Sequence, residues 1–278
     1  MKRYIPVGFS ILTTLGLSLF LAGCPQNDIV LSPTVPTATP TAPAGTPTPI
    51  PTAGNPTVTP TCVTFNDTYG SSSSLNNYNY YYDHWNPMTA TQLSYQVASG
   101  ELQVAPSGST VYSWALATNS NFNSSLANYK VEGDFKLDTV SQGVFGTVFH
   151  SNGPVSQAYC FQWNGLNNRW EIEKQTGAAS YYYPGCNAGN SYILGTWVHL
   201  KVTVSGGTFN AWETPESAPG AMDGTTVQVF TNVTDTVNCS GTAGLTAAYT
   251  AGSPGIRAYN IVSGNILHIK NFVANTCP

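Results

Sequence analysis

A two-residue alternation of apolar and polar side chains runs through most of the chain after Cys62 and restricts its fold more than any other feature. It is clearest at 129–137, where apolar residues stand at every second position apart from Gly133, and it recurs at 197–204. Period two places the apolar side chains on one face of a strand, whereas a helix needs spacings of three and four residues. Because helical spacing is absent, we expect an all-β fold.

Turn residues separate the expected strands. Ser205-Gly206-Gly207 stands between the alternation at 197–204 and a second one at 209–212, which predicts a β-hairpin. Further strands are expected at 93–98, 102–105, 144–150, 159–163, 169–175, 227–230, 244–249, 256–259 and 266–273. Many short strands without helices favour two packed antiparallel sheets.

The first 23 residues are typical of a secretory signal, with Lys2 and Arg3 before an apolar stretch at 5–20 that is too short and interrupted to span a bilayer. The stretch ends in Leu21-Ala22-Gly23-Cys24, which resembles the bacterial lipobox. That resemblance implies cleavage before Cys24, lipidation of this cysteine and membrane anchoring; the alternative is an ordinary secretory signal. No acidic residue directly follows Cys24, so the resemblance favours the outer membrane in a Gram-negative envelope. We therefore expect a cell-envelope protein facing outside the cytoplasm.

Residues 24–61 are predicted to be a disordered stalk. Of the 37 residues from Pro25 to Thr61, ten are Pro and ten are Thr, and none is aromatic. Such a chain cannot form a core, and at about 3.1 Å per residue in polyproline II geometry it would span up to roughly 110 Å. A Pro-rich ligand or an O-glycosylated stem are the alternatives. Residues 62–278 remain as one all-β domain.

The chain has very few charges, which excludes some function classes. Nine basic and thirteen acidic residues make up 8% of the 278 residues, whereas charged residues usually make up about 25% of a soluble domain. The net charge is −4 and the pI is near 5.4. A nucleic-acid binder needs a basic patch, so this class is excluded. The ordinary hydrophobic content of 41% also excludes a polytopic membrane protein. A protein partner remains open.

The order of several motifs resembles the concanavalin A-like lectin/glucanase superfamily in its laminin-G-like branch. The motifs are Phe65-Asn-Asp67-Thr-Tyr69, the strand at 129–137, the pair at 144–150 and 159–163, the segments at 169–174, 197–204 and 209–212, Asp235 with 241–245, and finally 267–273. The resemblance implies a two-sheet antiparallel β-sandwich of the jelly-roll type. It also implies a ligand groove on the outer face of a curved sheet that includes 144–150, 159–163 and 169–175.

Five cysteines remain after Cys24, and their spacing leaves the pairing open. In the superfamily the first and last strands lie side by side, which implies a Cys62–Cys277 bridge. Cys160 and Cys186 flank a single hairpin and are the second expected pair, with Cys186–Cys239 as the alternative. No Cys-x-x-Cys or paired His spacing supports a metal site built on these thiols.

Glu171 and Glu173 are the only acidic pair that suggests catalysis. Related glucanases place nucleophile and acid in a Glu-x-Asp-x-Glu pattern on one strand face; here Glu173 stands at the Asp position and Gln175 at the second Glu. We expect instead a solvated face on which Arg169 pairs with the carboxylates while Trp170 enters the core. No catalytic residue is therefore assigned, and a glycoside hydrolase or related sugar enzyme remains the alternative.

The supply of aromatic residues favours carbohydrate binding. Thirty of the 217 residues from Cys62 on are Tyr, Phe or Trp, and sugars are recognised by flat ring faces together with amide and hydroxyl groups. The candidate ligand-binding residues are His150, Gln162, Trp163, Arg169, Glu171, Tyr181, Tyr182 and Tyr183. The leading hypothesis is an envelope lipoprotein that displays a non-catalytic glycan-binding sandwich; a structural or adhesive protein-binding module is a further alternative.

The resemblance also bears on metals. Some superfamily members bind calcium where the chain ends meet, and Asp67 with Asn271 would stand at that position. No other cofactor is expected.

Overall fold

The computed structural model describes residues 62–278 with gaps at 83–92, 107–112, 118–124, 140–141, 153–156, 177–180, 188, 190, 237–238, 240–246 and 277–278. The predicted signal peptide, Cys24, the stalk and Cys277 lie outside the described residues. Within them, no helix is long and apolar enough to cross a membrane. The elements are β1 (Thr64–Asp67), a 3-10 helix η1 (Ser72–Asn77), β2 (Tyr78–Tyr82), β3 (Leu93–Ala98), β4 (Glu101–Pro106), β5 (Ser113–Ala117), β6 (Asn128–Leu137), β7 (Val144–Ser151), β8 (Gln157–Asn164), β9 (Arg169–Thr176), β10 (Tyr181–Asn187), β11 (Trp197–Ser205), β12 (Thr208–Glu216), β13 (Val227–Thr234), β14 (Ser253–Tyr259) and β15 (Leu267–Asn275).

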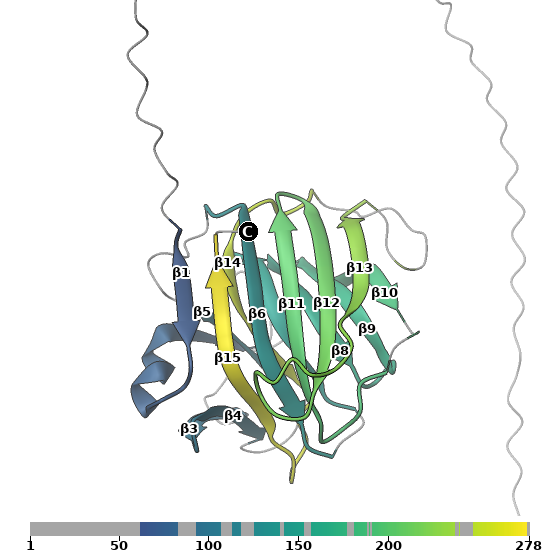
Figure 1. The fold of residues 1–278 in the computed structure, drawn as a ribbon. Helices are drawn as coiled ribbons and strands as arrows, with labels where there is room; N and C mark the ends of the chain where they lie inside the picture. The colour runs from purple at the N-terminus through teal and green to yellow at the C-terminus, as the bar shows by residue number, and fades with distance from the viewer. Residues whose placement is uncertain are drawn as a thin grey trace, which may run out of the picture. The chain divides into compact units, whose positions relative to one another are not determined.

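The strands form two stacked antiparallel sheets (Figure 1). Sheet A has the order β13-β12-β11-β6-β15-β4-β3, and β1 also pairs with β15. Sheet B has the order β10-β9-β8-β7-β14-β5-β2. The prediction of an all-β antiparallel sandwich is confirmed.

Aromatic rings from both sheets fill the space between them. Phe135 of β6 stacks on Phe145 of β7 with ring centroids 5.8 Å apart, and Phe149 of β7 meets Phe209 of β12 edge to face at 5.0 Å. Phe145 and Phe149 lie four residues apart on β7, so both rings point to the inner face of the strand and enter the core.

The hairpin expected around Gly206 is confirmed. β11 and β12 pair from Trp197↔Glu216 to Ser205↔Thr208, and Gly206 adopts a φ of +54°, which glycine tolerates at no steric cost. The strand expected at 244–249 is wrong in its described part: Ala247–Tyr249 is irregular, and the Tyr249 N–H donates to the Tyr159 hydroxyl, at 3.1 Å, instead of to a neighbouring strand.

The two chain ends of the domain lie side by side. β1 pairs with β15 from Thr64↔Asn275 to Asp67↔Phe272, and the Thr276 N–H donates to Val63 O at 3.0 Å. Cys62 is disulfide-bonded, but its predicted partner, Cys277, lies outside the described residues.

The expected Cys160–Cys186 bridge is wrong, because Cys186 is bonded to Cys239. Cys160 is a free, fully buried thiol packed with Val148 and Ala158 on the outer face of sheet B. The Cys239 N–H donates to Tyr183 O at 2.8 Å, which brings Cys239 to the β10 strand that carries Cys186. Burial raises the pKa of the Cys160 thiol to about 12, so this thiol stays protonated.

Candidate functional site

Polar side chains gather on the face of sheet B that points away from sheet A. Along β8 and β9, alternate side chains enter the core, and the intervening ones form this face. We call its polar members the outer-face cluster: Gln162, Asn164, Arg169, Glu171, Glu173, Gln175 and Arg257.

Strand register brings the cluster together. Gln162 pairs with Glu171, and Asn164 pairs with Arg169, across the β8–β9 ladder. Arg257 arrives from β14, where it pairs with Gly146 of β7, which in turn pairs with Gln162. Strands β8, β9 and β14 and the turn between β8 and β9 therefore supply the side chains around the two glutamates, and β7 lies between β8 and β14.

Glu171 is held by four side chains. Its Oε1 accepts hydrogen bonds from Arg169 Nε at 2.6 Å and Asn167 Nδ2 at 3.1 Å, and its Oε2 accepts from Asn164 Nδ2 at 2.8 Å and, more weakly, from Gln162 Nε2 at 3.4 Å. Arg169 lies two residues before Glu171 on the same strand face, as the sequence predicted. Glu171 thus fixes the orientation of the Arg169 side chain.

Glu173 also accepts hydrogen bonds from several side chains. Arg257 Nη2 and Gln175 Nε2 donate to its Oε1, both at 3.1 Å, and Gln162 Nε2 donates to its Oε2 at 2.8 Å. Gln162 therefore bridges the two carboxylates. The Oε1 atoms of Gln162 and Gln175 are buried and have no hydrogen-bond partner among the described residues.

The expectation of a solvated glutamate face is wrong. Glu171 is fully buried, Glu173 is 5% exposed and Arg257 is 6% exposed. Removing two carboxylates from water costs several kcal/mol each unless they are paired, which explains why an arginine and amide donors meet each one.

The accessible part of the cluster lies at the end of β9 next to the β8–β9 turn. The Arg169 side chain is 28% exposed, and its guanidinium carbon lies 5.5 Å from the centroid of the Tyr183 ring. Tyr183 is half-buried and Asn167 is exposed. The Tyr183 ring, the Arg169 guanidinium and the Asn167 amide thus lie at one accessible edge, where Glu171 accepts hydrogen bonds from Arg169 and Asn167.

Comparisons with known proteins concern the fold of this chain. No protein-family model matches it, and no curated protein matches its sequence. Among solved structures, the carbohydrate-binding module CBM66 from Bacillus subtilis is 13% identical with a TM-score of 0.44, covering 66% of this chain and 92% of its own. Lectin II from Ulex europaeus is 11% identical with a TM-score of 0.49, covering 77% and 98%. The VIP36 exoplasmic/lumenal domain in its Ca²⁺/Man3GlcNAc-bound form is 10% identical with a TM-score of 0.48, covering 77% and 88%.

Gln162, Arg169, Glu171 and Tyr183 are the predicted ligand-binding residues that the structure brings together. Tyr182 pairs with Lys174, and the side chain of Tyr181 lies outside the described part of the chain. The sequence prediction missed Asn164, Asn167, Glu173's role as a partner of Arg257, and Arg257 itself. Asn167 and Asn168 are residues typical of a turn, so the sequence offered a signal for Asn167. Arg257 lies more than 80 residues after Glu173, and no local pattern links the two.

Trp163 does not lie on the outer face of sheet B. It is 3% exposed and packs in the core against Trp170 at 5.4 Å and Tyr192 at 6.0 Å. Neighbouring residues of a strand point to opposite faces, so Gln162 and Trp163 cannot share one.

His150 is also absent from the outer face of sheet B. Its φ of +48° interrupts the alternation of β7, and its ring is fully buried among core aromatics, 5.6 Å from the Tyr129 ring. The ring nitrogens lie at 2.9 and 3.2 Å from the backbone oxygens of Tyr249 and Ala127. Burial lowers the pKa of His150, which favours the neutral form.

Asp67 and Asn271 do not fit a shared calcium site. Asp67 pairs with Phe272 across β1–β15, whereas Asn271 lies at an irregularity of β15 with a φ of +49°. The Asp67 oxygens accept from the Tyr69 N–H at 2.8 Å and from Asn77 Nδ2 at 3.1 Å, while Asn271 Nδ2 donates to Asp134 at 2.6 Å. The two side chains thus serve different parts of sheet A.

A second charged cluster lies on the outer face of sheet A, where Asp134, His199 and Glu216 present possible ligand atoms within 4.8 Å of one another. His199 Nδ1 lies 2.6 Å from Asp134 Oδ1, and its Nε2 lies 3.7 Å from Glu132. Burial lowers the pKa of His199, but the hydrogen bond to Asp134 and the nearby Glu132 carboxylate outweigh it and raise the pKa to about 9. The cluster is therefore a charged network centred on an imidazolium.

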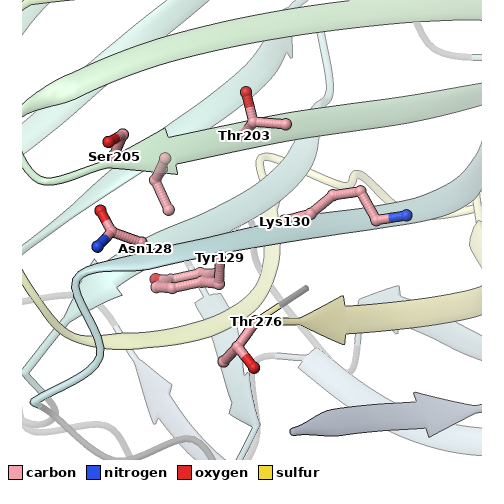
Figure 2. A pocket seen from close by; sticks show the side chains of 7 residues that line it. Asn128, Tyr129, Lys130, Thr203, Ser205 and Thr276 are labelled. Carbon is pink, nitrogen blue, oxygen red and sulfur yellow. The ribbon is translucent and has the colours of Figure 1, made fainter. Parts of the chain in front are cut away.

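A pocket of about 310 Å³ lies elsewhere, at one end of β6 and β11 (Figure 2). Figure 2 shows Asn128, Tyr129 and Lys130 on β6 opposite Thr203 and Ser205, with Thr276 nearby. Its single charged side chain, Lys130, is paired with Glu132 at 2.7 Å, so the pocket offers no polar group as well prepared for a ligand as Arg169.

Proposed function

We propose that the folded domain binds carbohydrate, without catalysis, at the edge formed by Arg169, Tyr183 and Asn167. The observation that carries this proposal is the partly exposed Arg169 guanidinium over the Tyr183 ring, oriented by the buried Glu171. An aromatic face can stack on the apolar face of a sugar ring, and guanidinium and amide N–H groups can donate to its hydroxyls. Because Glu171 orients Arg169 in advance, less side-chain freedom is lost on binding.

The local charge balance favours a neutral, hydroxyl-rich ligand. Arg169 is paired with Glu171 and Arg257 is paired with Glu173, so the cluster presents hydrogen-bond donors without an excess of positive charge. An anionic ligand would have to compete with a carboxylate that is already in place.

The contacts of the two glutamates argue against hydrolysis. Every carboxylate oxygen of Glu171 and Glu173 already accepts a hydrogen bond from a protein side chain. A glycosidase needs one carboxyl group as acid and another as nucleophile or base, both facing the scissile bond. Here the oxygens face protein donors instead.

The experiment is a glycan array probed with the purified chain, followed by titration of the strongest ligand. We expect Tyr183→Ala and Arg169→Ala each to weaken binding at least about tenfold, as expected for removal of a stacking ring or a charged donor. Lys201 lies 5.1 Å over the Trp212 ring on the outer face of sheet A, so Trp212→Ala is a matched control for loss of an accessible cation–aromatic pair. It should leave binding unchanged.

Two outcomes would contradict the proposal. Binding to no glycan would leave the structural or adhesive protein-binding alternative, and release of reducing sugar that Glu171→Gln abolishes would establish the enzymatic one. Equal losses for the Tyr183 and Trp212 variants would remove the assignment to this edge.

We further propose that the domain is displayed from the cell envelope by a lipid on Cys24 and the stalk of residues 25–61. The support is the lipobox-like sequence before Cys24 and the Pro- and Thr-rich composition that follows. Cys24→Ser should move the protein from the membrane fraction to the soluble fraction. Unchanged membrane retention would contradict lipidation at this residue.

A further inference from the structure

Lys174 of β9 is a fully buried lysine on the core side of sheet B. Its Nζ contacts the carboxylate of Asp235, whose side chain is only 2% exposed, and donates to Ala247 O at 3.0 Å. The Nζ also lies over the rings of Tyr249, at 4.8 Å, and Tyr159, at 5.8 Å. Lysines are almost never fully buried unless they are paired, and Asp235 supplies a carboxyl group for this amine.

Tyr159 contacts the same carboxylate oxygen of Asp235 as Lys174 does. Its hydroxyl donates to Asp235 Oδ2 at 2.8 Å and accepts from the Tyr249 N–H at 3.1 Å. Burial, together with the hydrogen bond to Asp235, raises the pKa of the Tyr159 hydroxyl, so this group remains a donor. A donor on a carboxyl oxygen draws electrons from the carboxyl carbon and makes it a better electrophile.

Aromatic rings surround the contact between Lys174 and Asp235. The Tyr159 ring packs against Phe209, with centroids 4.6 Å apart, and against Tyr249 at 5.4 Å. An ammonium and a carboxylate lose their hydration in such a setting, and transfer of one proton between them removes both charges. The transfer leaves an amine in contact with a carboxylic acid.

We propose that Lys174 and Asp235 become joined by an intramolecular isopeptide bond. After the proton transfer, the Nζ lone pair attacks Cγ of Asp235 and forms the N–C bond. The acid hydroxyl leaves with a proton from the nitrogen as one water molecule, and the product is a neutral secondary amide. No oxidant, reductant or co-reactant enters the balance.

The hydrogen-bonding groups already present match those that the product needs. A secondary amide has one N–H and one C=O to satisfy when it is buried. Ala247 O lies in position to accept from the amide N–H, and the Tyr159 hydroxyl lies in position to donate to the amide oxygen. The amide therefore replaces two buried charges, and its N–H and C=O both have partners.

The bond would join the two sheets. Asp235 directly follows β13, the edge strand of sheet A, whereas Lys174 lies on β9 of sheet B, 61 residues earlier. The disulfide Cys186–Cys239 ties the same segment to β10. The isopeptide bond would hold this segment to sheet B under conditions that reduce the disulfide.

Peptide mass spectrometry of the full-length chain tests the bond without any variant. After reduction, alkylation and trypsin digestion, we expect the peptide 170–201, uncleaved at Lys174, to remain joined to the peptide 202–257, with the mass of one water missing. Fragmentation should place the link at Lys174 and Asp235. Separate peptides 170–174 and 175–201 at their full masses would overturn the proposal, as would a water loss located elsewhere.

Variants locate the chemistry. Lys174→Arg and Asp235→Ala should each abolish the joined peptide, and Lys130→Arg, at a lysine paired with Glu132 outside this site, should keep it. Tyr159→Phe keeps the ring but removes the donor, so freshly synthesised protein should form the joined species more slowly. A joined species that persists in Lys174→Arg would refute the assignment of the nucleophile.

Discussion

At the scale of single residues, Glu171 organises the outer-face cluster. It is fully buried and accepts hydrogen bonds from Arg169, Asn164 and Asn167. Glu171→Gln keeps the shape but removes the charge opposite Arg169. Because one partner of a largely buried pair is lost, we expect the free energy of unfolding to fall by about 2–3 kcal/mol, measured by urea denaturation.

Glu213 of β12 is the matched control. It is also buried, at 7% exposure, and burial alone raises the pKa of its carboxyl group. Burial disfavours the charged form of Glu213. Glu213→Gln removes this charge, so the free energy of unfolding should stay the same or rise. Equal losses for Glu171→Gln and Glu213→Gln would show that the arginine pair at Glu171 does not stabilise the fold.

His199 should make stability depend on pH on the alkaline side. Its pKa rises from 6.5 to about 9 on folding, so its stabilising contribution is complete below pH 6.5 and disappears as the pH rises through 9. His199→Gln should lower the free energy of unfolding by about 1–3 kcal/mol at pH 6 and by little at pH 9.5. Urea denaturation at both pH values measures this difference; a loss that is the same at both would contradict the assignment of the charge to His199.

At the scale of secondary structure, Gly146 of β7 lies where the backbone of β8 leaves no room for a side chain. A Cβ at this position would lie 2.0 Å from Phe161 O and 2.7 Å from the Cα of Gln162, and both atoms belong to the backbone of β8. Gly146→Ala must therefore separate the two strands beneath the outer-face cluster. We expect a loss of about 3 kcal/mol or more in the free energy of unfolding, measured by thermal or urea denaturation.

Gly70 provides the comparison for this substitution. A Cβ there would meet nothing within 4 Å. Gly70→Ala should leave the free energy of unfolding nearly unchanged. A similar loss in both variants would mean that the close approach of β7 and β8 is not what requires glycine at 146.

Alternation along a strand could be read from the sequence, but partners across strands could not. The pattern at 129–137 and 197–204 predicted β6 and β11, because each has one buried face. It also placed Arg169, Glu171 and Glu173 on one face. The arrival of Arg257 depends on the β7–β14 register, which is set by contacts between segments more than 100 residues apart, and no local pattern encodes it.

The burial of the glutamates was equally hidden in the local sequence. A charged residue at every second position is typical of a solvated strand face, and only the positions of neighbouring strands decide whether that face is covered. His150 illustrates the converse case: its place in the alternation predicts the outer face, but a single left-handed backbone conformation turns it into the core.

At the scale of the whole molecule, about a third of the scarce charged side chains are buried. The chain has nine basic and thirteen acidic residues. In its described part, eight of these 22 residues are buried: Asp67, Asp134, Glu171, Glu173, Lys174, Glu213, Glu216 and Arg257. The surface is therefore poorer in charge than the composition suggests. Such a molecule has little long-range electrostatic field with which to attract a charged partner.

This distribution predicts that glycan binding depends little on salt. Between about 50 and about 500 mM NaCl the Debye length shortens severalfold, but salt does not screen stacking or neutral hydrogen bonds. We therefore expect the dissociation constant of the strongest glycan on the array to change less than about twofold. Isothermal titration at the two salt concentrations measures it. A much larger weakening would show that the ligand is anionic and that it draws Arg169 away from Glu171, in which case Glu171→Gln should strengthen binding at low salt.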